Sequence, residues 1–223
     1  MLPRPVAGHL LTPGTHPPLL AFQSRTVEVA LSPGLTFQVQ EALFQRRPDH
    51  WAQVWPSSLA LSRWLLEQLP GSLPAAGKEL GCGVGLVSMT MAHLGMRAEG
   101  TDREPGALAV ALGNAHRNAL VGFTTSHLDW SEPEGEATQF MAASDVLYEN
   151  ETPLRLFALL QTAGLLLPLG RLLMGGPRRR PAPLNELVLM LQDQGYSHHE
   201  ESQRVDWKGR SEDIDVHVLR RPA

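Results

Sequence analysis

Two runs of alternating apolar and polar residues stand near the start of the chain. They cover residues 21–31 and 35–40, and Ser32-Pro33-Gly34 joins them. Such alternation is typical of strands with one covered face, and a short connection with glycine is typical of a hairpin. The pattern predicts a β-hairpin extension over residues 20–41. Residues 1–18 contain five prolines, which disfavour regular structure, so we expect a flexible arm there.

Beyond residue 50, helical periodicity appears and then alternates with short apolar runs. Leu59, Trp64 and Leu69 belong to an apolar stripe on a helix predicted over residues 57–69. Further helices are predicted over residues 86–94, 105–120, 153–167 and 184–194, and strands over residues 78–80, 96–101, 123–128, 140–148, 171–174 and 214–219. Alternating strands and helices are typical of a doubly wound, mostly parallel sheet. We therefore expect one α/β domain over residues 1–223, with residues 51–223 as its core.

Composition excludes several classes of protein. The 223 residues are 43% hydrophobic and 19% charged, with a net charge of -4, so neither a disordered chain nor a nucleic-acid binder is expected. Cys82 is the only cysteine, which excludes an intramolecular disulfide and a metal site of several thiolates. Charged residues and a proline interrupt the apolar stretch 154–174, so no membrane segment is expected. The N-terminus lacks the pattern of a signal peptide, and we expect a cytoplasmic protein.

The strongest chemical signal is the string Glu79-Leu80-Gly81-Cys82-Gly83-Val84-Gly85-Leu86, at the turn from a predicted strand into a helix. Glycines let the backbone approach a ligand closely, and the start of a helix offers free amide donors. Asp102 ends the next predicted strand, roughly 20 residues on, where a ribose-binding carboxylate is expected in dinucleotide folds. The combination predicts a cofactor that contains a nucleoside.

The spacing of the glycines indicates which nucleoside. The nicotinamide and flavin fingerprint requires glycine at position 86, where this chain has Leu86, so a pyrophosphate ligand and an oxidoreductase are disfavoured. The string instead resembles motif I of the seven-stranded S-adenosylmethionine-dependent methyltransferases.

Three further strings narrow this resemblance. Leu128-Asp129-Trp130 follows the third core strand, the segment 143–152 contains Asp145 and Tyr148 in an Asp-x-x-Tyr pattern, and Val54-Trp55-Pro56 precedes the first helix. With the upstream hairpin they look like the methyltransferase-16 group, which contains protein-lysine methyltransferases. The resemblance covers most of residues 20–176. It implies a Rossmann-like, seven-stranded, mostly parallel sheet with helices on both faces.

The resemblance also implies a cofactor, a reaction and a set of site residues. The cofactor is S-adenosylmethionine, and the product is S-adenosylhomocysteine. Asp145 and Tyr148 are the implied catalytic residues, facing the methyl group and the incoming nucleophile. Three acids are implied to contact the cofactor: Glu79 near the methionine end, Asp102 at the ribose and Asp129 near the adenine amino group. The full set of implied cofactor contacts is Trp55, Glu79, Gly81, Cys82, Gly83, Gly85, Asp102, Asp129, Trp130 and Ser144.

The implied reaction is methylation of a nitrogen, with a lysine side chain of a protein as acceptor. Two alternatives stay open: a small-molecule N-methyltransferase, because fold alone does not set the acceptor, and a catalytically weak cofactor-binding module that acts through a protein partner. Cys82 has no assignable histidine and acid partners, so a small residue in a tight loop is favoured over a nucleophile.

Three departures from the group are visible. Residues 74–78 lack the usual apolar run, so the first core strand is expected to be short or poorly formed. Ser144 stands where a small apolar residue is commoner. The basic run 176–181 is either a solvated loop or a docking site for an acidic protein surface or RNA.

The string His198-His199-Glu200-Glu201 resembles a metal cluster on paper. Neighbouring side chains of a strand point to opposite faces, so adjacent histidines chelate poorly, and a solvated polar segment is favoured. His217 shows no metal-ligand spacing either, and no metal is expected.

Overall fold

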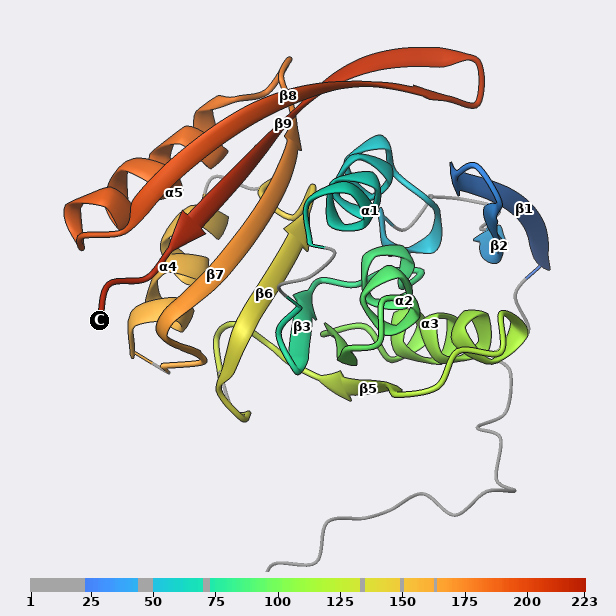
Figure 1. The fold of residues 1–223 in the computed structure, drawn as a ribbon, viewed down its shortest axis with the longest axis horizontal. Helices are drawn as coiled ribbons and strands as arrows, with labels where there is room; N and C mark the ends of the chain where they lie inside the picture. Colours follow the sequence, from blue (N-terminus) through green and yellow to red (C-terminus); the bar gives the residue numbers. More distant parts are fainter. Residues whose placement is uncertain (1–22, 44–49, 70–72, 133–134, 149–150, 163) are drawn as a thin grey trace, which may run out of the picture.

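A seven-stranded sheet in the order β5-β4-β3-β6-β7-β9-β8 forms the centre of the molecule (Figure 1). The computed structural model describes residues 23–43, 50–69, 73–132, 135–148, 151–162 and 164–223. The strands of this sheet are β3 (Ala76–Leu80), β4 (Arg97–Asp102), β5 (Phe123–His127), β6 (Thr138–Ser144), β7 (Leu166–Pro177), β8 (Ser197–Trp207) and β9 (Arg210–Arg220). The first five are parallel to one another, and β9 is antiparallel to both β7 and β8. The predicted mostly parallel, seven-stranded sheet is confirmed.

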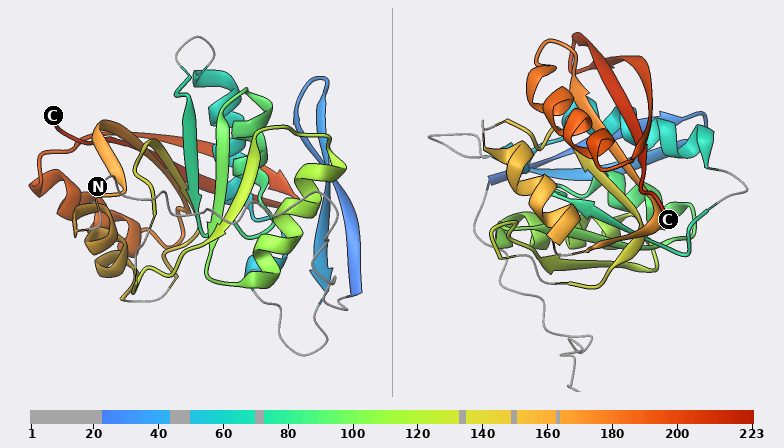
Figure 2. Two further views of the ribbon diagram at one scale, coloured as in Figure 1. Left: turned by 90° about the horizontal axis from the view of Figure 1, so that it is seen from below. Right: turned by 90° about the vertical axis from the view of Figure 1, so that its left-hand side faces the viewer.

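Helices cover both faces of the sheet, as expected for a doubly wound fold (Figure 2). A short 3-10 helix, η1 (His50–Ala52), precedes them, and the α-helices are α1 (Pro56–Gln68), α2 (Leu86–His93), α3 (Pro105–Arg117), α4 (Thr152–Thr162) and α5 (Ala182–Asp193). Helices α1 and α2 pack together on one side, and α4 and α5 pack together on the other. Among the described helices, none has the length and apolar character needed to cross a bilayer.

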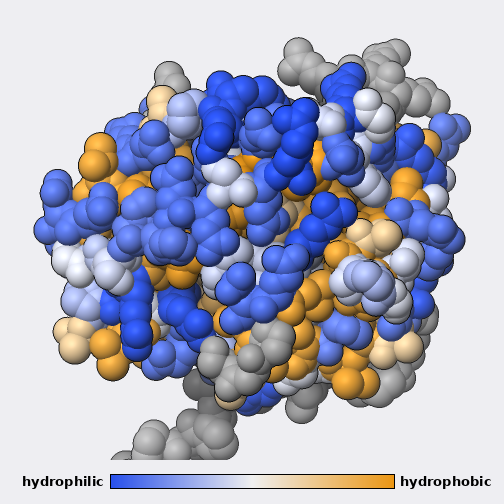
Figure 3. Space-filling view, turned by 45° about the horizontal axis from the view of Figure 1, so that its top comes forward, coloured by the Kyte–Doolittle hydropathy of each residue, from blue (hydrophilic) through white to orange (hydrophobic). Residues whose placement is uncertain are grey.

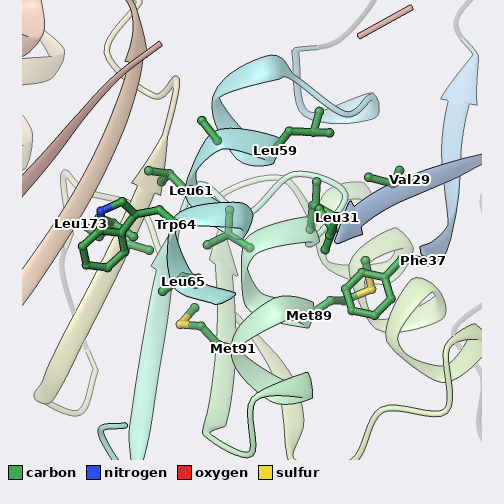
Figure 4. Packing of buried hydrophobic residues seen from close by; sticks show 14 of the residues in the cluster. Val29, Leu31, Phe37, Leu59, Leu61, Trp64, Leu65, Met89, Met91 and Leu173 are labelled. Atoms are coloured by element: carbon green, nitrogen blue, oxygen red, sulfur yellow. The ribbon is translucent and has the colours of Figure 1, made fainter. Parts of the chain in front are cut away.

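Two hydrophobic clusters hold these layers together. The larger one joins α1, α2, the hairpin and one face of the sheet, and Leu61, Trp64 and Leu65 of α1 lie near its centre (Figure 4). The smaller one joins α4 and α5 to the opposite face, with Leu156 and Leu187 fully buried. The helical periodicity of residues 57–69 therefore identified a buried stripe correctly.

The N-terminal hairpin is a separate two-stranded sheet of β1 (Gln23–Ser32) and β2 (Leu35–Leu43). Its alternation buries Val29 and Phe37 against the larger cluster. Two asparagines of α3 complete the attachment by bonding the backbone of β2. Asn114 Oδ1 accepts from the amide of Gln40 at 2.7 Å, and Asn118 Oδ1 accepts from the amide of Gln38 at 2.9 Å. The expected hairpin is present, whereas the expected arm at residues 1–18 lies outside the described residues.

Strand β3 is short, as expected, but it is well formed, since it pairs with β4 along its whole length and with β6 from Lys78 to Leu80. A Cβ atom on Gly77 would lie 2.6 Å from Met96 Cε and 2.8 Å from Met91 Sδ, so methionine side chains fill the space that an apolar residue usually fills. The buried Lys78 pairs with Glu99, its Nζ 3.1 Å from Oε2. Local partners therefore replace the missing apolar run.

The sequence missed one strand and misplaced several boundaries. The missed strand is β8, whose residues are mostly polar and of which only Val205 is buried. It lies at an edge of the sheet. The face that carries it is mostly hydrophilic (Figure 3). Helix α4 ends at Thr162 rather than residue 167, α3 ends at Arg117 rather than residue 120, and the strand expected over residues 140–148 ends at Ser144.

Candidate active site

A cavity of about 460 Å³ opens at the carboxyl ends of β3, β4 and β6. From β3 the chain proceeds to β4 and β5 on one side of the sheet and then crosses to β6 on the other, and open sheets bind ligands at such a change of direction. Of the twelve site residues expected from sequence, Glu79 and Gly85 do not line this cavity. The ten that do are Trp55, Gly81, Cys82, Gly83, Asp102, Asp129, Trp130, Ser144, Asp145 and Tyr148.

The glycine loop between β3 and α2 has backbone angles that favour glycine. Gly81, Gly83 and Gly85 have φ angles of 65°, 52° and 85°, in the left-handed region. A Cβ on Gly83 would lie 2.9 Å from the carbonyl oxygen of Trp51, and one on Gly85 would lie 2.8 Å from Ala111 Cβ. Gly85 thus allows the close approach of the glycine loop to Ala111 of α3 behind the cavity, while Gly81 and Gly83 form the cavity wall.

Asp102, at the end of β4, orders this loop. Its Oδ2 accepts a hydrogen bond from the Gly83 amide at 3.0 Å, and its Oδ1 accepts one from the Glu104 amide at 3.0 Å. Burial raises the pKa of Asp102, and the two backbone bonds oppose that rise. Each oxygen keeps a second lone pair, so this carboxylate can still accept bonds from hydroxyl groups in the cavity.

Glu79 lies behind the loop and is 1% exposed. Its Oε2 accepts hydrogen bonds from the Ser88 amide, at 2.8 Å, and from the Ser88 hydroxyl. Burial raises the pKa of Glu79 to about 8, so the group is protonated at neutral pH. Its Oε1 is buried and has no hydrogen-bond partner within the described part of the chain. Glu79 therefore anchors the first turn of α2 from behind the cavity wall.

Cys82 is 5% exposed, and burial raises the pKa of its thiol well above the ordinary value. A reactive cysteine needs the opposite, a lowered pKa and an accessible sulfur. The geometry agrees with a small residue in a tight loop.

The loop after β5 contributes an acid and an aromatic ring to the same cavity. Asp129 Oδ1 accepts from the Ser131 amide at 2.8 Å and from its hydroxyl at 2.6 Å, and these bonds lower the pKa of Asp129. Trp130 is partly buried against the smaller hydrophobic cluster. A flat apolar surface beside an ionised acid suits a purine ring with an exocyclic amino group.

Asp145 follows β6 in a left-handed conformation, with φ 53°, which is uncommon for a residue with a side chain. Its amide donates to the Gly175 carbonyl at 2.8 Å, and Arg180 Nη2 lies 3.4 Å from its Oδ1. Burial raises the pKa of Asp145 to about 6, although Arg180 acts in the opposite direction. A carboxyl group with a pKa near 6 in a cavity is a candidate for moving a proton at neutral pH.

Three aromatic rings, those of His50, Trp55 and Tyr148, lie close together and line the same cavity as Asp145. The His50 ring centroid lies 5.1 Å from that of Tyr148 and 6.2 Å from that of Trp55, and Trp55 Nε1 donates to the His50 carbonyl at 2.6 Å. Sequence reasoning missed His50, which lies 98 positions before Tyr148 and just ahead of a helix. The only local sign that His50 belongs to the site was its closeness in sequence to Trp51 and Trp55.

The basic run after β7 supplies two further residues to the cavity wall, Arg179 and Arg180. Each arginine of the run contacts an acid of the same chain. Arg178 pairs with Asp215 at 2.8 Å and Arg179 with Glu212 at 2.5 Å, while Arg180 pairs with Asp145. Because each of these positive charges has an acidic partner, the run is not an uncompensated basic patch. Arg179 and Arg180 make it part of the cavity wall.

The residues present fit S-adenosylmethionine. The glycine loop forms a cradle that a Cβ would fill, and Asp102 and Asp129 line the cavity. These acids and amides match the hydroxyls, amino groups and carboxylate of such a ligand.

Comparison with known proteins supports the same fold. No family model matches the chain. A protein N-lysine methyltransferase of Danio rerio, METTL21A, is 37% identical over a 123-residue alignment that covers 50% of this chain and 53% of that protein. The chain thus spans about half the length of this curated relative.

Several solved structures have the same architecture. The magnesium protoporphyrin IX methyltransferase ChlM of Synechocystis PCC 6803, with bound S-adenosylmethionine, superposes over 73% of this chain and 77% of its own, with a TM-score of 0.56 and 23% identity. The N-methyltransferase NodS of Bradyrhizobium japonicum WM9, with S-adenosylhomocysteine, superposes over 74% of this chain and 86% of its own, with a TM-score of 0.58 and 18% identity. The fold of the chain is therefore that of the Rossmann-like methyltransferases.

Proposed function

We propose that this chain is an S-adenosylmethionine-dependent N-methyltransferase whose acceptor is a lysine side chain of a protein. The observation that carries the proposal is that one cavity is lined both by Asp102, a ribose-type acid, and by the Asp145 carboxyl group. A nucleoside cofactor and an amine acceptor can meet between these two acids. The similarity to a protein N-lysine methyltransferase supports this choice of acceptor.

The cofactor end would be held mainly by groups that are already fixed. Asp102 would accept hydrogen bonds from the ribose hydroxyls, and Asp129 would accept one from the adenine amino group. Trp130 would cover the adenine ring. The wall formed by Gly81 and Gly83 of the glycine loop would face the methionine end. When bound, S-adenosylmethionine supplies a methyl group on a positively charged sulfur, which is an excellent leaving group. The protein then has to align the acceptor and exclude water.

The acceptor lysine must lose its extra proton before the methyl group is transferred. An unperturbed lysine has a pKa of about 10.4, and an apolar channel lowers that value. His50, Trp55 and Tyr148 provide such a channel. Asp145, with a pKa of about 6, is ionised at neutral pH and can accept the proton directly or through water. Arg180 occupies that position in the structure, so the incoming ammonium group takes over its ion pair with Asp145.

The acceptor side of the cavity favours a protein substrate over a free amine for one reason. Tyr148 is 43% exposed, and Arg180 is also exposed at the mouth of the cavity. A side chain can therefore enter while the rest of its protein stays outside. A small-molecule acceptor and a catalytically weak binding module remain as the two other outcomes of the test below.

The test has two stages. Calorimetry first measures binding of S-adenosylhomocysteine to the wild type and to Asp102→Ala, with circular dichroism to check that both are folded. Heat from the wild type and none from the variant supports the cofactor site, whereas no heat from the wild type supports the inactive module. Tritiated S-adenosylmethionine is then incubated with a cell lysate and the enzyme. Label in protein, recovered as methyl-lysine, supports the proposal, and label only in small molecules contradicts it.

A cytoplasmic location is part of the proposal. A lone cysteine that is buried beside the glycine loop supports it, because such a thiol needs no oxidising compartment. Fractionation of cells that express the untagged chain tests this location.

A further inference from the structure

Three potential metal ligands come together on the outer antiparallel strands, away from the cavity. They are His198 and Glu200 of β8 and His217 of β9, whose ligand atoms all lie within 4.8 Å of one another. His198 Nε2 is 2.9 Å from His217 Nδ1, and Glu200 Oε2 is 3.8 Å from the same nitrogen of His217. None of these three residues lines the described cavity.

The strand register explains the cluster. Glu200 is directly opposite His217, and His198 is opposite Leu219, so His198 is the diagonal neighbour of His217. Residues two apart on a strand share a face, which places His198 and Glu200 together and turns His199 to the other face. Adjacent histidines alone would make a poor chelate, but the third ligand comes from the neighbouring strand, 17 positions after Glu200.

The cluster has the chemistry of a metal site rather than of a solvated surface. His217 is 2% exposed, and its ring stacks on that of His198 with centroids 5.1 Å apart. Burial disfavours the charged form of both rings and so lowers the pKa of each. Asp215, two residues before His217, does not compete, because its carboxylate pairs with Arg178 and Ser202.

We propose that His198, Glu200 and His217 bind one divalent transition-metal ion of the zinc type. Two imidazole nitrogens and one carboxylate are ligands that zinc accepts, with a water in the fourth position, whereas magnesium and calcium prefer oxygen ligands alone. Zinc–nitrogen bonds of about 2.0–2.1 Å at a tetrahedral angle separate two nitrogens by about 3.3 Å. The observed 2.9 Å therefore has to open by only a few tenths of an ångström. The ion replaces the proton that the two rings share and joins the edge strand β8 to β9.

The test uses the full chain without a polyhistidine tag. Calorimetry with zinc chloride should show one tight site in the wild type, and cobalt chloride should give the visible absorption bands of a low-coordinate cobalt ion. Zinc at 100 times its dissociation constant should raise the melting temperature by about 5–10 °C. Magnesium chloride should produce neither effect.

His198→Ala and His199→Ala form a matched pair, because they are neighbours on opposite faces of one edge strand. His198→Ala, which removes a ligand from a partly exposed position, should weaken zinc binding at least tenfold and abolish the cobalt spectrum. His199→Ala should leave both unchanged, and Glu200→Gln should weaken binding while the fold persists. Zinc binding that is absent from the wild type, or equal in the two histidine variants, would overturn the proposal. Neither result bears on the methyltransferase function, since the cavity is not involved.

Discussion

The cofactor end of the cavity is fixed by the backbone, whereas its acceptor end is held by side chains. Asp102 binds two amides of its own chain and is buried, so its position is set whether or not a ligand is present. The Asp145 carboxylate contacts the exposed Arg180 at 3.4 Å and shares the cavity with aromatic rings from distant segments. We infer that the first region is preorganised for one ligand and that the second can adjust to a large acceptor.

The largest effect is expected at the acceptor end. Asp145→Asn removes the proton acceptor and should lower the rate of methyl transfer by about 10²- to 10⁴-fold. It should change the affinity for S-adenosylhomocysteine little, because the cofactor end stays intact. Single-turnover transfer and calorimetry measure the two quantities. A variant that transfers methyl groups at the wild-type rate would remove Asp145 from the mechanism.

The buried acid Glu79 should make the stability of the folded chain depend on pH. Glu79 has a pKa of about 8 in the folded chain and about 4.5 as its ordinary value, so the folded state binds more protons between these two values. Stability should therefore fall as pH rises through this window, by up to about 1.4 kcal/mol per pH unit. Glu79→Gln cannot ionise and should lose this dependence.

Chemical denaturation between pH 5 and pH 8 measures this difference. Glu67→Gln, an exposed change on α1, serves as the control and should follow the wild type. If the free energy of unfolding changes with pH in the same way for Glu79→Gln and the wild type, burial of Glu79 does not cause the loss of stability at higher pH.

A change in the glycine loop should damage the preorganised end. Gly83→Ala introduces a Cβ that would meet the Trp51 carbonyl oxygen at 2.9 Å and has an unfavourable φ of 52°. We expect a loss of about 1–3 kcal/mol in stability and at least a tenfold loss in affinity for S-adenosylhomocysteine. Gly95→Ala has a similar backbone penalty, with φ 94°, but meets no atom within 4 Å. Its affinity should match that of the wild type, and an equal loss in both variants would separate the loop from cofactor binding.

The smallest expected effect concerns the ion pair at the mouth of the cavity. Arg180 lowers the pKa of Asp145, so Arg180→Ala should raise that pKa above about 6. The acid limb of the pH–rate profile, where activity falls as Asp145 becomes protonated, should move to higher pH by roughly half a unit or more. Arg179→Ala is the matched control, because Arg179 pairs with Glu212 and acts on Asp145 less. Equal shifts in both variants would show that the specific pair is unimportant.

Some features were predictable from sequence because they depend on local backbone geometry. The glycine loop and the acids Asp102 and Asp145 stand at strand ends, and parallel strands bring their carboxyl ends to one edge of a sheet. The hairpin followed from a period of two and a glycine turn. Strand β8 was missed because an edge strand needs little apolar surface, and His50 was missed because nothing near it in sequence indicates Tyr148.

Apart from strand β8, the sequence by itself determined the order of strands and helices, the bend before α2 and the acids at the ends of β4 and β6. These features arise from interactions among near neighbours: side-chain periodicity, the freedom of glycine and the start of a helix. Tertiary structure alone decided that Arg180 faces Asp145, that His50 lies beside Tyr148 and that His217 joins His198. Such contacts depend on which strands become neighbours and in which register, and those choices follow from burial of the whole sheet rather than from any one segment.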